Sequence, residues 1–449
     1  MITPKKYRHA VVLGGSFSGC IFARVMSDYA EKVTVIEKDP CPDEHLIRRG
    51  VPQEHHVHLL LVRGRQMLET LYPGITAELE LNGAMTADLS RDIKCFQYGN
   101  WNNRYETGIQ AHYSSRSLID RMLRRFTRKL DNVEFRHNSR AVGFSLDQQQ
   151  RTITQVNLSS EGVSDIIDAD FVVDTSGRGS RALAQLRELG FTPPETEVVP
   201  SKLGYVSCLY QRKPEFEKLW KVLLILPDPK KVRRLGVISP IENDQWMVTL
   251  GSAHDDCPKA DDDSFLDFAR NLPTKDLYEI IADGERISPI HSFNISGAKR
   301  LRFDKAYTLP GNFLVGGDAL CHFNPFYSQG MTVCSLQAEA FQAELAKPRT
   351  DSKSLQLAVS QVTNSAWEAA KSEDQRFAHD DIAKPISLRV RHWYTAHLAK
   401  AVGQNENVAK KSLLVGNFLE EPSSLFSAET ALQVFGTNLR QVLMGAARG

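Results

Sequence analysis

The chain has 449 residues, of which 42% are hydrophobic and 24% are charged, and its mean hydropathy is −0.32. This composition excludes an intrinsically disordered chain, and the length predicts two or three domains. The formal net charge of +1 provides no overall field that would hold nucleic acid or an anionic membrane. The apolar runs HLLLV and VLLIL are too short to cross a bilayer, so no integral membrane segment is expected.

Seven cysteines are scattered along the chain without a C-x-x-C pair. That pattern predicts neither a disulfide framework nor a zinc knuckle, and it fits a reducing compartment. The apolar run after the basic N-terminus is too short for a secretory signal, so a cytoplasmic protein is expected. His55, His56 and His58 lie close together, but no carboxylate or cysteine spacing completes a ligand set. We therefore expect no metal, and a packed or pocket-lining role for these histidines.

The stretch VVLGGSFSGC is the turn of a predicted strand–helix–strand unit. Residues 9–15 form an apolar strand, residues 17–28 place apolar side chains at helical spacing, and residues 32–39 form a second strand. Glu37 follows Gly14 by 23 residues, near the offset of about 20 expected for a carboxylate that accepts a ribose hydroxyl. The unit favours dinucleotide binding, with a plain βαβ unit as the alternative.

Ser16 stands where the fingerprint G-x-G-x-x-G has its second glycine, which lets the backbone approach a pyrophosphate closely. Serine adds only one CH2OH group, and its hydroxyl is able to donate to a phosphate. The helix N-terminus supplies further donors and a favourable dipole. We therefore expect the altered loop to bind a dinucleotide.

Two further motifs follow in the first half of the chain. SSRSLIDRML places Arg116 near the start of a helix capped by Ser114 or Ser115, although a surface arginine on a capped helix is an alternative interpretation. DADFVVDTSGRGSR begins with an apolar strand that ends at Asp174. From residue 181 to residue 300 the pattern changes to strands separated by Pro, Asp, Asn and Gly. The strands are LGYVSCLYQR, KVLLILPD, RRLGVISPI and WMVTLGSA, and the helices after them are SFLDFARNL and TKDLYEIIA.

The stretch PGNFLVGGDALCHFNPFYSQGMTVCSLQAEAF contains a strand, FLVGG, with Asp318 at its carboxyl end. A loop that contains Pro325 leads to Gly330, where a helix is predicted to begin. An acid at the carboxyl end of a strand, beside a glycine at a helix start, is a place to bind a polar ligand. The remaining predicted helices cover residues 352–368, 408–419 and 429–447.

In their order and spacing from residue 10 to residue 345, these motifs resemble the single-component FAD-dependent monooxygenases, the para-hydroxybenzoate hydroxylase-like (group A) flavoproteins. The words RRGVPQ, NPFYSQGMTV and IENDQWMVTLGSAHDDCP look closest to bacterial natural-product epoxidases, including those that act on polyketide polyenes. The family usually has Gly-Gln-Gly where this chain has Ser328-Gln329-Gly330, a departure that bears on flavin mobility.

The resemblance implies roles for particular residues. Asp318 takes the position of the aspartate that holds the ribityl chain of FAD, and Asp174 that of the aspartate serving FAD and the transient NAD(P)H contact. Arg116 and Arg48 correspond to arginines that reach the FAD phosphates. The backbone at Gly330 and Met331 would face the flavin N1–C2=O edge, where negative charge appears on reduction. The residues expected to contact FAD are Gly14, Gly15, Ser16, Phe17, Ser18, Gly19, Glu37, Lys38, Arg48, Arg116, Val142, Asp174, Gly177, Gly317, Asp318, Pro325, Gln329, Gly330 and Met331.

The expected fold is α/β (α+β overall), a Rossmann-like FAD-binding domain with an inserted β-sheet substrate domain and a helical C-terminal region. The FAD-binding domain is expected in residues 1–183, with some substrate-domain segments near 80–113, and again in 306–349. The substrate-binding domain is expected in 184–305 and the helical region in 350–449. A second G-x-G-x-x-G does not occur, so no separate NAD(P)H domain is expected.

The resemblance implies a monooxygenase in which NAD(P)H reduces FAD and a flavin C4a-hydroperoxide delivers one oxygen atom from O2. Pro325, Phe326, Tyr327 and His58 are pocket candidates, and no catalytic side chain is assigned because the flavin carries the chemistry. Expected partners are a small hydrophobic organic substrate and O2, and a separate flavin reductase is not indicated. Epoxidation of a polyketide or terpenoid alkene is favoured, with aromatic hydroxylation as the alternative and a flavin-dependent prenyl or alkene reductase as the alternative of another class. The W-x-W-x-I-P motif of flavin halogenases is absent.

Overall fold

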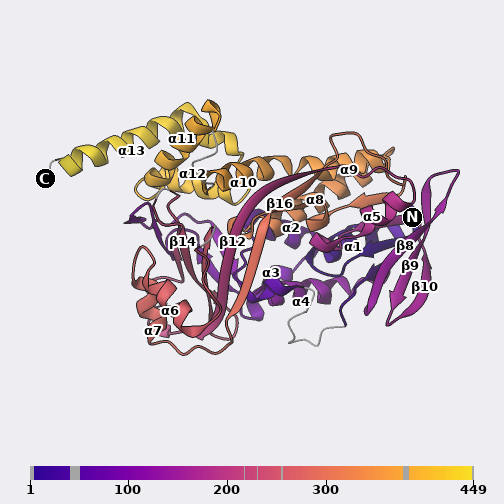
Figure 1. The fold of residues 1–449 in the computed structure, drawn as a ribbon, viewed down its shortest axis with the longest axis horizontal. Helices are drawn as coiled ribbons and strands as arrows, with labels where there is room; N and C mark the ends of the chain where they lie inside the picture. The colour runs from indigo at the N-terminus through magenta and orange to yellow at the C-terminus, as the bar shows by residue number, and fades with distance from the viewer. Residues whose placement is uncertain are drawn as a thin grey trace.

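The computed structural model describes residues 5–40, 51–216, 218–229, 231–253, 256–377 and 384–446. A parallel sheet of five strands in the order β17-β11-β1-β2-β7 forms one half of the molecule (Figure 1). Strands of a parallel sheet that are buried on both faces are mostly apolar. In β11 all four residues, FVVD, are buried, and the first three of them are apolar. The strands are β1 (Tyr7–Leu13), β2 (Ala30–Ile36), β7 (Val133–Arg136), β11 (Phe171–Asp174) and β17 (Phe313–Val315).

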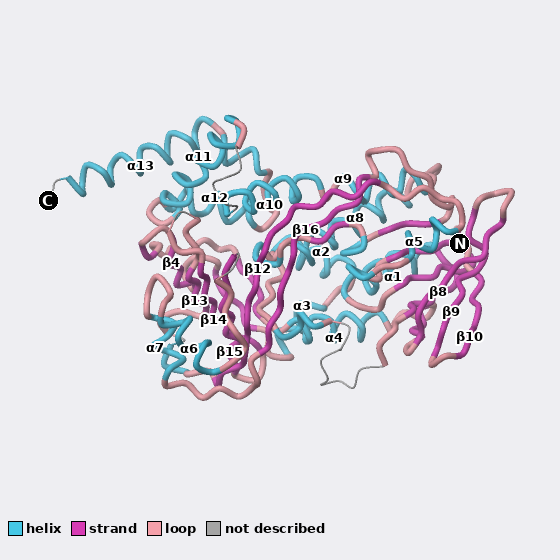
Figure 2. The backbone as a smooth tube through the Cα atoms, in the orientation of Figure 1, coloured by secondary structure: helices cyan, strands magenta, loops and turns pink. Residues whose placement is uncertain are grey.

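A second, eight-stranded sheet has the order β18-β16-β12-β15-β14-β13-β4-β5. Its long strands β12 and β16 run side by side across the molecule, and they pair antiparallel (Figure 2). The strands, in chain order, are β4 (Ile93–Gln97), β5 (Asn100–Trp101), β12 (Glu195–Gln211), β13 (Val222–Ile225), β14 (Arg234–Ile241), β15 (Gln245–Ala253), β16 (His291–Arg302) and β18 (Cys321–His322).

Two small antiparallel sheets complete the strands. The first has the order β10-β9-β8 and lies at the end of the molecule near the N-terminus in Figure 1. The second pairs β3 with β6. Their strands are β3 (Met85–Asp88), β6 (Gln110–Tyr113), β8 (Ser139–Asp147), β9 (Thr152–Ser160) and β10 (Val163–Asp168).

Helices cover both large sheets and form the C-terminal region. α6 and α7 pack on the eight-stranded sheet through buried side chains such as Phe265 and Leu277. The helices are α1 (Phe17–Tyr29), α2 (Val62–Leu71), α3 (Ile75–Leu81), α4 (Arg116–Thr127), α5 (Ala182–Glu188), α6 (Asp262–Arg270), α7 (Asp276–Ala282), α8 (Gly330–Leu345), α9 (Ser352–Gln361), α10 (Asn364–Phe377), α11 (Ile386–Val402), α12 (Glu406–Gly416) and α13 (Ala428–Ala446).

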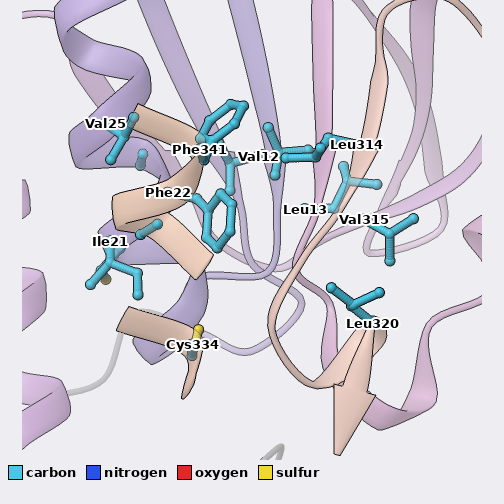
Figure 3. Packing of buried hydrophobic residues seen from close by; sticks show 14 of the residues in the cluster. Val12, Leu13, Ile21, Phe22, Val25, Leu314, Val315, Leu320, Cys334 and Phe341 are labelled. Atoms are coloured by element: carbon cyan, nitrogen blue, oxygen red, sulfur yellow. The ribbon is translucent and has the colours of Figure 1, made fainter. Parts of the chain in front are cut away.

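The main core holds the first glycine turn and the start of α8 in one rigid block. Phe22 of α1 packs against Phe341 of α8 with ring centroids 5.4 Å apart, and Phe341 also lies 6.2 Å from Phe171 of β11. Figure 3 shows Phe22 and Phe341 beside Val12 of the parallel sheet, with Leu314 beyond Val12. Because interiors are closely packed, the ends of β1, β11 and β17 keep fixed relative positions.

This architecture confirms the predicted α/β fold with a parallel sheet, a second β-sheet region and a helical C-terminal region. Two details differ from the expectation. The predicted helix 352–368 is two helices, because α9 ends at Gln361 and the Thr363 hydroxyl bonds back to the Ser360 carbonyl before α10 begins. The sequence did not single out α11, whose buried residues are only Tyr394, Leu398 and Ala401, too few for a clear helical stripe.

Candidate functional site

A cavity of about 590 Å³ lies at the carboxyl ends of β1, β2, β11 and β17. That edge is where open parallel sheets bind ligands, and cofactor sites usually occupy about 300–1,000 Å³. The predicted residues that line it are Gly14, Ser16, Phe17, Ser18, Glu37, Lys38, Arg116, Gly177, Asp318, Pro325, Gly330 and Met331, together with the pocket candidate His58. Residues from six separate stretches of sequence therefore meet in one site.

The first wall is the tight turn between β1 and α1. Gly14 has φ +97°, and a Cβ there would lie 2.7 Å from the Thr175 carbonyl oxygen. A Cβ on Gly19 would lie 1.7 Å from the Gly14 carbonyl oxygen, so the helix packs directly on the turn. The first-turn amides of α1 lack partners within the helix, and they therefore offer donors to an anion in the cavity.

Ser16 joins this turn to α4 through a polar cluster. Its hydroxyl donates to Asp120 Oδ2 at 3.0 Å, and Arg116 Nε donates to Asp120 Oδ1 at 2.9 Å. The Arg116 guanidinium also lies over the Phe17 ring, 5.4 Å from its centroid. Asp120 therefore fixes both the serine that replaces a glycine and the arginine that lines the cavity.

Glu37 marks one end of the cavity, directly after β2. It is 6% exposed, and its two oxygens accept the backbone N–H groups of Gly15 at 2.8 Å and Asp39 at 3.0 Å. Each carboxylate oxygen has a second lone pair. The side chain is thus held in place while it remains able to accept hydroxyl donors from a ligand.

Asp318 and the N-terminus of α8 mark another part of the cavity. Asp318 follows β17 in a short 3-10 helix, and burial raises the pKa of its carboxyl, opposed by the charges of Arg116 and Arg178. It makes no hydrogen bond within the described part of the chain. A Cβ on Gly330 would meet no atom within 4 Å, so the first turn of α8 borders open space.

Asp174 does not line the cavity. It is fully buried and accepts hydrogen bonds from the Ser176 amide at 3.0 Å, the Ser176 hydroxyl at 2.6 Å and the Ser180 hydroxyl at 2.5 Å. Burial raises its pKa against these bonds. Asp174 therefore shapes the turn 175–181, and that turn supplies the lining residues.

The other predicted residues lie as follows. Gly15, Gly19 and Gly317 adjoin lining residues without lining the cavity, and Gln329 precedes Gly330 with its buried Oε1 lacking a partner in the described part of the chain. Val142 is 48% exposed, and the neighbouring Ala141 lines the cavity instead. Phe326 and Tyr327 face a second, smaller cavity. Arg48 lies outside the described residues.

The cavity has an aromatic wall that the sequence did not reveal. Tyr205 of β12 and Phe293 of β16 line it, and the Arg178 guanidinium lies 5.7 Å from the centroid of the Phe293 ring. His58 and His322 also line it, and burial lowers the pKa of each to about 4. Both imidazoles are therefore neutral near pH 7. No local pattern marks these residues, because they are brought in by the register of β12 and β16.

The histidine cluster is built into the surrounding structure. His55 stacks on His291 with centroids 3.6 Å apart, and His56 Nδ1 lies 2.7 Å from the Ser207 hydroxyl. Among residues 5–40, 51–216 and the later described ranges, no group of three or more His, Cys, Asp or Glu is arranged to hold a metal. None of the helices that the structure describes is long and apolar enough to span a membrane.

The donor set of the cavity fits FAD. Glu37 suits a ribose, the α1 N-terminus with Arg116 suits a pyrophosphate, and the unpartnered carboxyl of Asp318 suits a polyol chain. The open space at Gly330 leaves room for a planar ring at the positive end of α8.

Solved flavoprotein structures share this fold over most or all of the chain. A flavoprotein/dehydrogenase from Cytophaga hutchinsonii has a TM-score of 0.69 at 14% identity, covering 97% of this chain and 99% of that one. The p-nitrophenol 4-monooxygenase PnpA from Pseudomonas putida has a TM-score of 0.65 at 15% identity, covering 93% and 100%. The probable FAD-dependent monooxygenase pqsL from Pseudomonas aeruginosa has a TM-score of 0.61 at 16% identity, covering 83% and 98%. The chain therefore has the fold of the group A FAD-dependent flavoprotein monooxygenases, as its motifs predicted.

A sequence relative extends over most of the chain. Protein Rv3254 of Mycobacterium tuberculosis is 29% identical over an aligned length of 397 residues, and the alignment covers 84% of this chain and 82% of that protein. No family model matches the chain.

Proposed function

We propose that the chain is an FAD-dependent monooxygenase that inserts one oxygen atom from O2 into a small lipophilic substrate, with NAD(P)H as the electron donor. The observation that carries this proposal is one cavity that combines FAD-type groups with an aromatic wall. Asp318 and Gly330 lie in the same cavity as Tyr205 and Phe293. A cofactor ring and an apolar substrate would thus lie in the same cavity, as oxygen transfer requires.

In this proposal the chain's own residues bind, orient and shield. Glu37 accepts ribose hydroxyls, Arg116 and the α1 amides hold the pyrophosphate, and Asp318 accepts ribityl hydroxyls. The α8 N-terminus at Gly330 and Met331 stabilises negative charge on the flavin. Bound FAD supplies the redox chemistry with O2.

The proposal includes the domain division expected from the sequence. The FAD-binding domain comprises 1–183 and 306–349, the substrate domain 184–305, and the helical region 350–449. Two strands of the 80–113 segment, β4 and β5, pair into the eight-stranded sheet, which supports counting that segment with the substrate domain.

The favoured reaction is epoxidation of an alkene in a polyketide or terpenoid molecule. Apolar side chains at Tyr205, Phe293, Ile295 and Phe323 support a lipophilic substrate. Alkene epoxidation needs no general base. The words shared with natural-product epoxidases support the same choice.

Aromatic hydroxylation is the second candidate. His58 and His322 line the cavity and are neutral near pH 7, so a ring nitrogen of either could accept a hydrogen bond from a bound phenol. PnpA, which has a similar fold, is named as a p-nitrophenol 4-monooxygenase.

Turnover under ¹⁸O2 tests the proposal. The purified holoprotein is supplied with NADH or NADPH and with separate panels of polyenes and phenols. The masses of the products are measured by mass spectrometry. Incorporation of one ¹⁸O atom is expected, and the product structure decides between epoxide and phenol. Gain of two hydrogens without oxygen would identify an alkene reductase, and the absence of substrate-dependent NAD(P)H consumption would contradict an enzymatic role.

A further inference from the structure

Helix α13 packs on the rest of the protein largely through its polar side. Asn438 Nδ2 donates to the His397 carbonyl of α11 at 3.0 Å, and Asn405 Nδ2 donates to the Thr437 hydroxyl at 3.0 Å. Among the described side chains of α13, Val434 is the one large apolar residue that is buried. Five others are exposed: Leu432, Phe435, Leu439, Val442 and Leu443. A surface helix normally turns its apolar side inward, so α13 has the reverse orientation.

The exposed apolar side chains of α13 form a stripe along the helix. Positions 432, 435, 439 and 442 follow one another at intervals of three and four residues. This is the spacing at which one helix presents a seam to another helix. Figure 1 shows the C-terminal half of α13 projecting away from the rest of the molecule, so that part of the stripe extends beyond the neighbouring helices.

Helix α11 carries a second exposed apolar stripe, formed by Ile386, Val390 and Trp393. The two stripes meet where the Trp393 ring stacks on the Phe435 ring, with centroids 5.6 Å apart. We call these eight side chains the α11–α13 face. Their exposed fractions range from 39% for Phe435 to 77% for Ile386.

The area of the α11–α13 face is large enough for a stable dimer. Eight large side chains that are on average more than half exposed present on the order of 1,000 Å² of surface. The largest apolar patch of a typical monomer is about 300–600 Å², whereas a standard protein interface buries about 800 Å² on each partner. The face therefore exceeds what a monomer usually exposes and reaches what a dimer requires.

The charges of α13 favour a protein partner over an anionic lipid surface. Glu429 and Arg440 are the charged residues within Ala428–Ala446, one of each sign. Helices that bind anionic lipid are rich in Lys and Arg on their polar side. A twofold axis brings identical residues together, so a face shared by two copies of one chain must avoid a strong charge of one sign, and the stripe of α13 meets that condition.

We propose that the α11–α13 face binds a second copy of this chain in an isologous dimer. Each copy then offers the same projecting helix and the same α11 stripe, so the part of α13 that extends beyond one copy is covered by the other. The regular seam of α13 is matched by the helices that the second copy supplies. This inference goes beyond the proposed function and does not depend on it.

Sedimentation equilibrium of the purified full-length protein tests the inference. We expect a particle with twice the chain mass of 50.4 kDa. Leu439→Glu and Ile386→Glu each place a carboxylate in the interface, the first from α13 and the second from α11. Each variant is expected to weaken dimerisation by about a hundredfold or more, because the substitution occurs twice in a symmetric pair. Both positions are exposed in the single chain, so far-ultraviolet circular dichroism should show unchanged helix content.

Leu81→Glu is the matched control, because it makes the same exchange at an exposed leucine of α3, which Figure 1 shows apart from α11 and α13. This variant should remain a dimer. A monomeric unaltered protein would overturn the inference, and so would a dimer that both interface variants leave intact, since the contact would then lie on another face.

An anionic lipid surface is the competing occupant, because Arg389, Arg391 and Lys400 of α11 are exposed. Vesicles of phosphatidylcholine with phosphatidylserine test it by flotation. Flotation of a monomeric protein that is lost in Leu439→Glu and retained in Leu81→Glu would assign the α11–α13 face to lipid and overturn the inference.

Discussion

The Ser16 hydroxyl donates to Oδ2 of Asp120 at 3.0 Å, across 104 residues of sequence. The residue that breaks the glycine fingerprint is therefore engaged with the protein. Asp120 also binds Arg116, so the replacement of a glycine links the first turn to the arginine that lines the cavity. Serine at this position therefore makes a hydrogen bond to Asp120 that a glycine, which has no side chain, could not make.

Replacing Ser16 by alanine tests whether its hydroxyl serves the fold or the cofactor. A hydrogen bond to a carboxylate contributes about 1.5–3 kcal/mol, so we expect the free energy of unfolding to fall by that amount, with FAD affinity nearly unchanged. Urea denaturation of the apoprotein and a flavin titration measure the two quantities. Ser117→Ala, in α4, is the control for loss of a serine hydroxyl that donates to a different carboxylate, that of Glu54. Loss of FAD without loss of stability would instead assign the Ser16 hydroxyl to a phosphate.

The Asp318 carboxyl is expected to lower the stability of the apoprotein and to strengthen FAD binding. Burial raises the pKa of this carboxyl more than Arg116 and Arg178 lower it, and no hydrogen bond to it is made in the described part of the chain, so Asp318→Asn should stabilise the apoprotein. Asp318→Ala should weaken FAD binding about tenfold to hundredfold, because hydrogen bonds to a charged acceptor are lost. Thermal unfolding of the apoprotein and flavin fluorescence titration check both outcomes. An alanine variant that is purified with its full flavin content would refute the assigned role.

Alanine substitutions at Gly330 and Gly19 distinguish a steric clash with the bound FAD from a steric clash within the protein. Gly330→Ala places a methyl group in open space, so apoprotein stability should be maintained while FAD binding weakens. Gly19→Ala brings its methyl group to 1.7 Å from the Gly14 carbonyl oxygen, so it should destabilise the protein with or without FAD. Melting temperatures of apo and FAD-loaded forms of both variants provide the comparison. If Gly330→Ala leaves FAD affinity unchanged, the ring does not approach the start of α8.

Burial of a neutral His56 is expected to make the free energy of unfolding depend on pH. Burial, followed by the nearby histidines, lowers its pKa from 6.5 to about 3, so the folded protein keeps it neutral while the unfolded chain binds a proton. Its contribution is complete above pH 6.5 and is lost as the pH falls toward 3. We expect His56→Gln to make the decline in unfolding free energy between pH 6.5 and 4.5 shallower by up to about 1.4 kcal/mol per pH unit. Denaturation at a series of pH values measures the two slopes, and equal slopes would contradict a buried neutral His56.

Local sequence patterns identified the residues that stand at the ends of parallel strands. Glu37 and Asp318 each follow an apolar strand, and Gly330 precedes an apolar helix, so order and spacing were enough to place them at one edge of the sheet. Asp174 was also correctly placed at a strand end, but the sequence did not reveal that Ser176 and Ser180 occupy its oxygens. That arrangement depends on side-chain geometry in a short turn.

The residues that would decide substrate choice had no comparable signal. Tyr205 and Phe293 face the cavity only because β12 and β16 pair in a particular register, 88 residues apart. Asp374 meets Tyr327 because α10 packs back against the 3-10 turn Pro325–Tyr327. Such contacts join distant segments whose individual patterns describe only a strand or a helix, so the three-dimensional structure was needed to find them.

The lining of the cofactor cavity extends from Leu13 to Cys334, which has a consequence for biosynthesis. A nascent chain that has completed β1 and α1 lacks β11 and β17, its neighbours on one side of the sheet. The complete binding site therefore forms only after about three quarters of the chain has left the ribosome. Cofactor capture is expected to be a late event that consolidates an almost finished fold, so cellular flavin supply should influence how much newly made protein survives proteolysis.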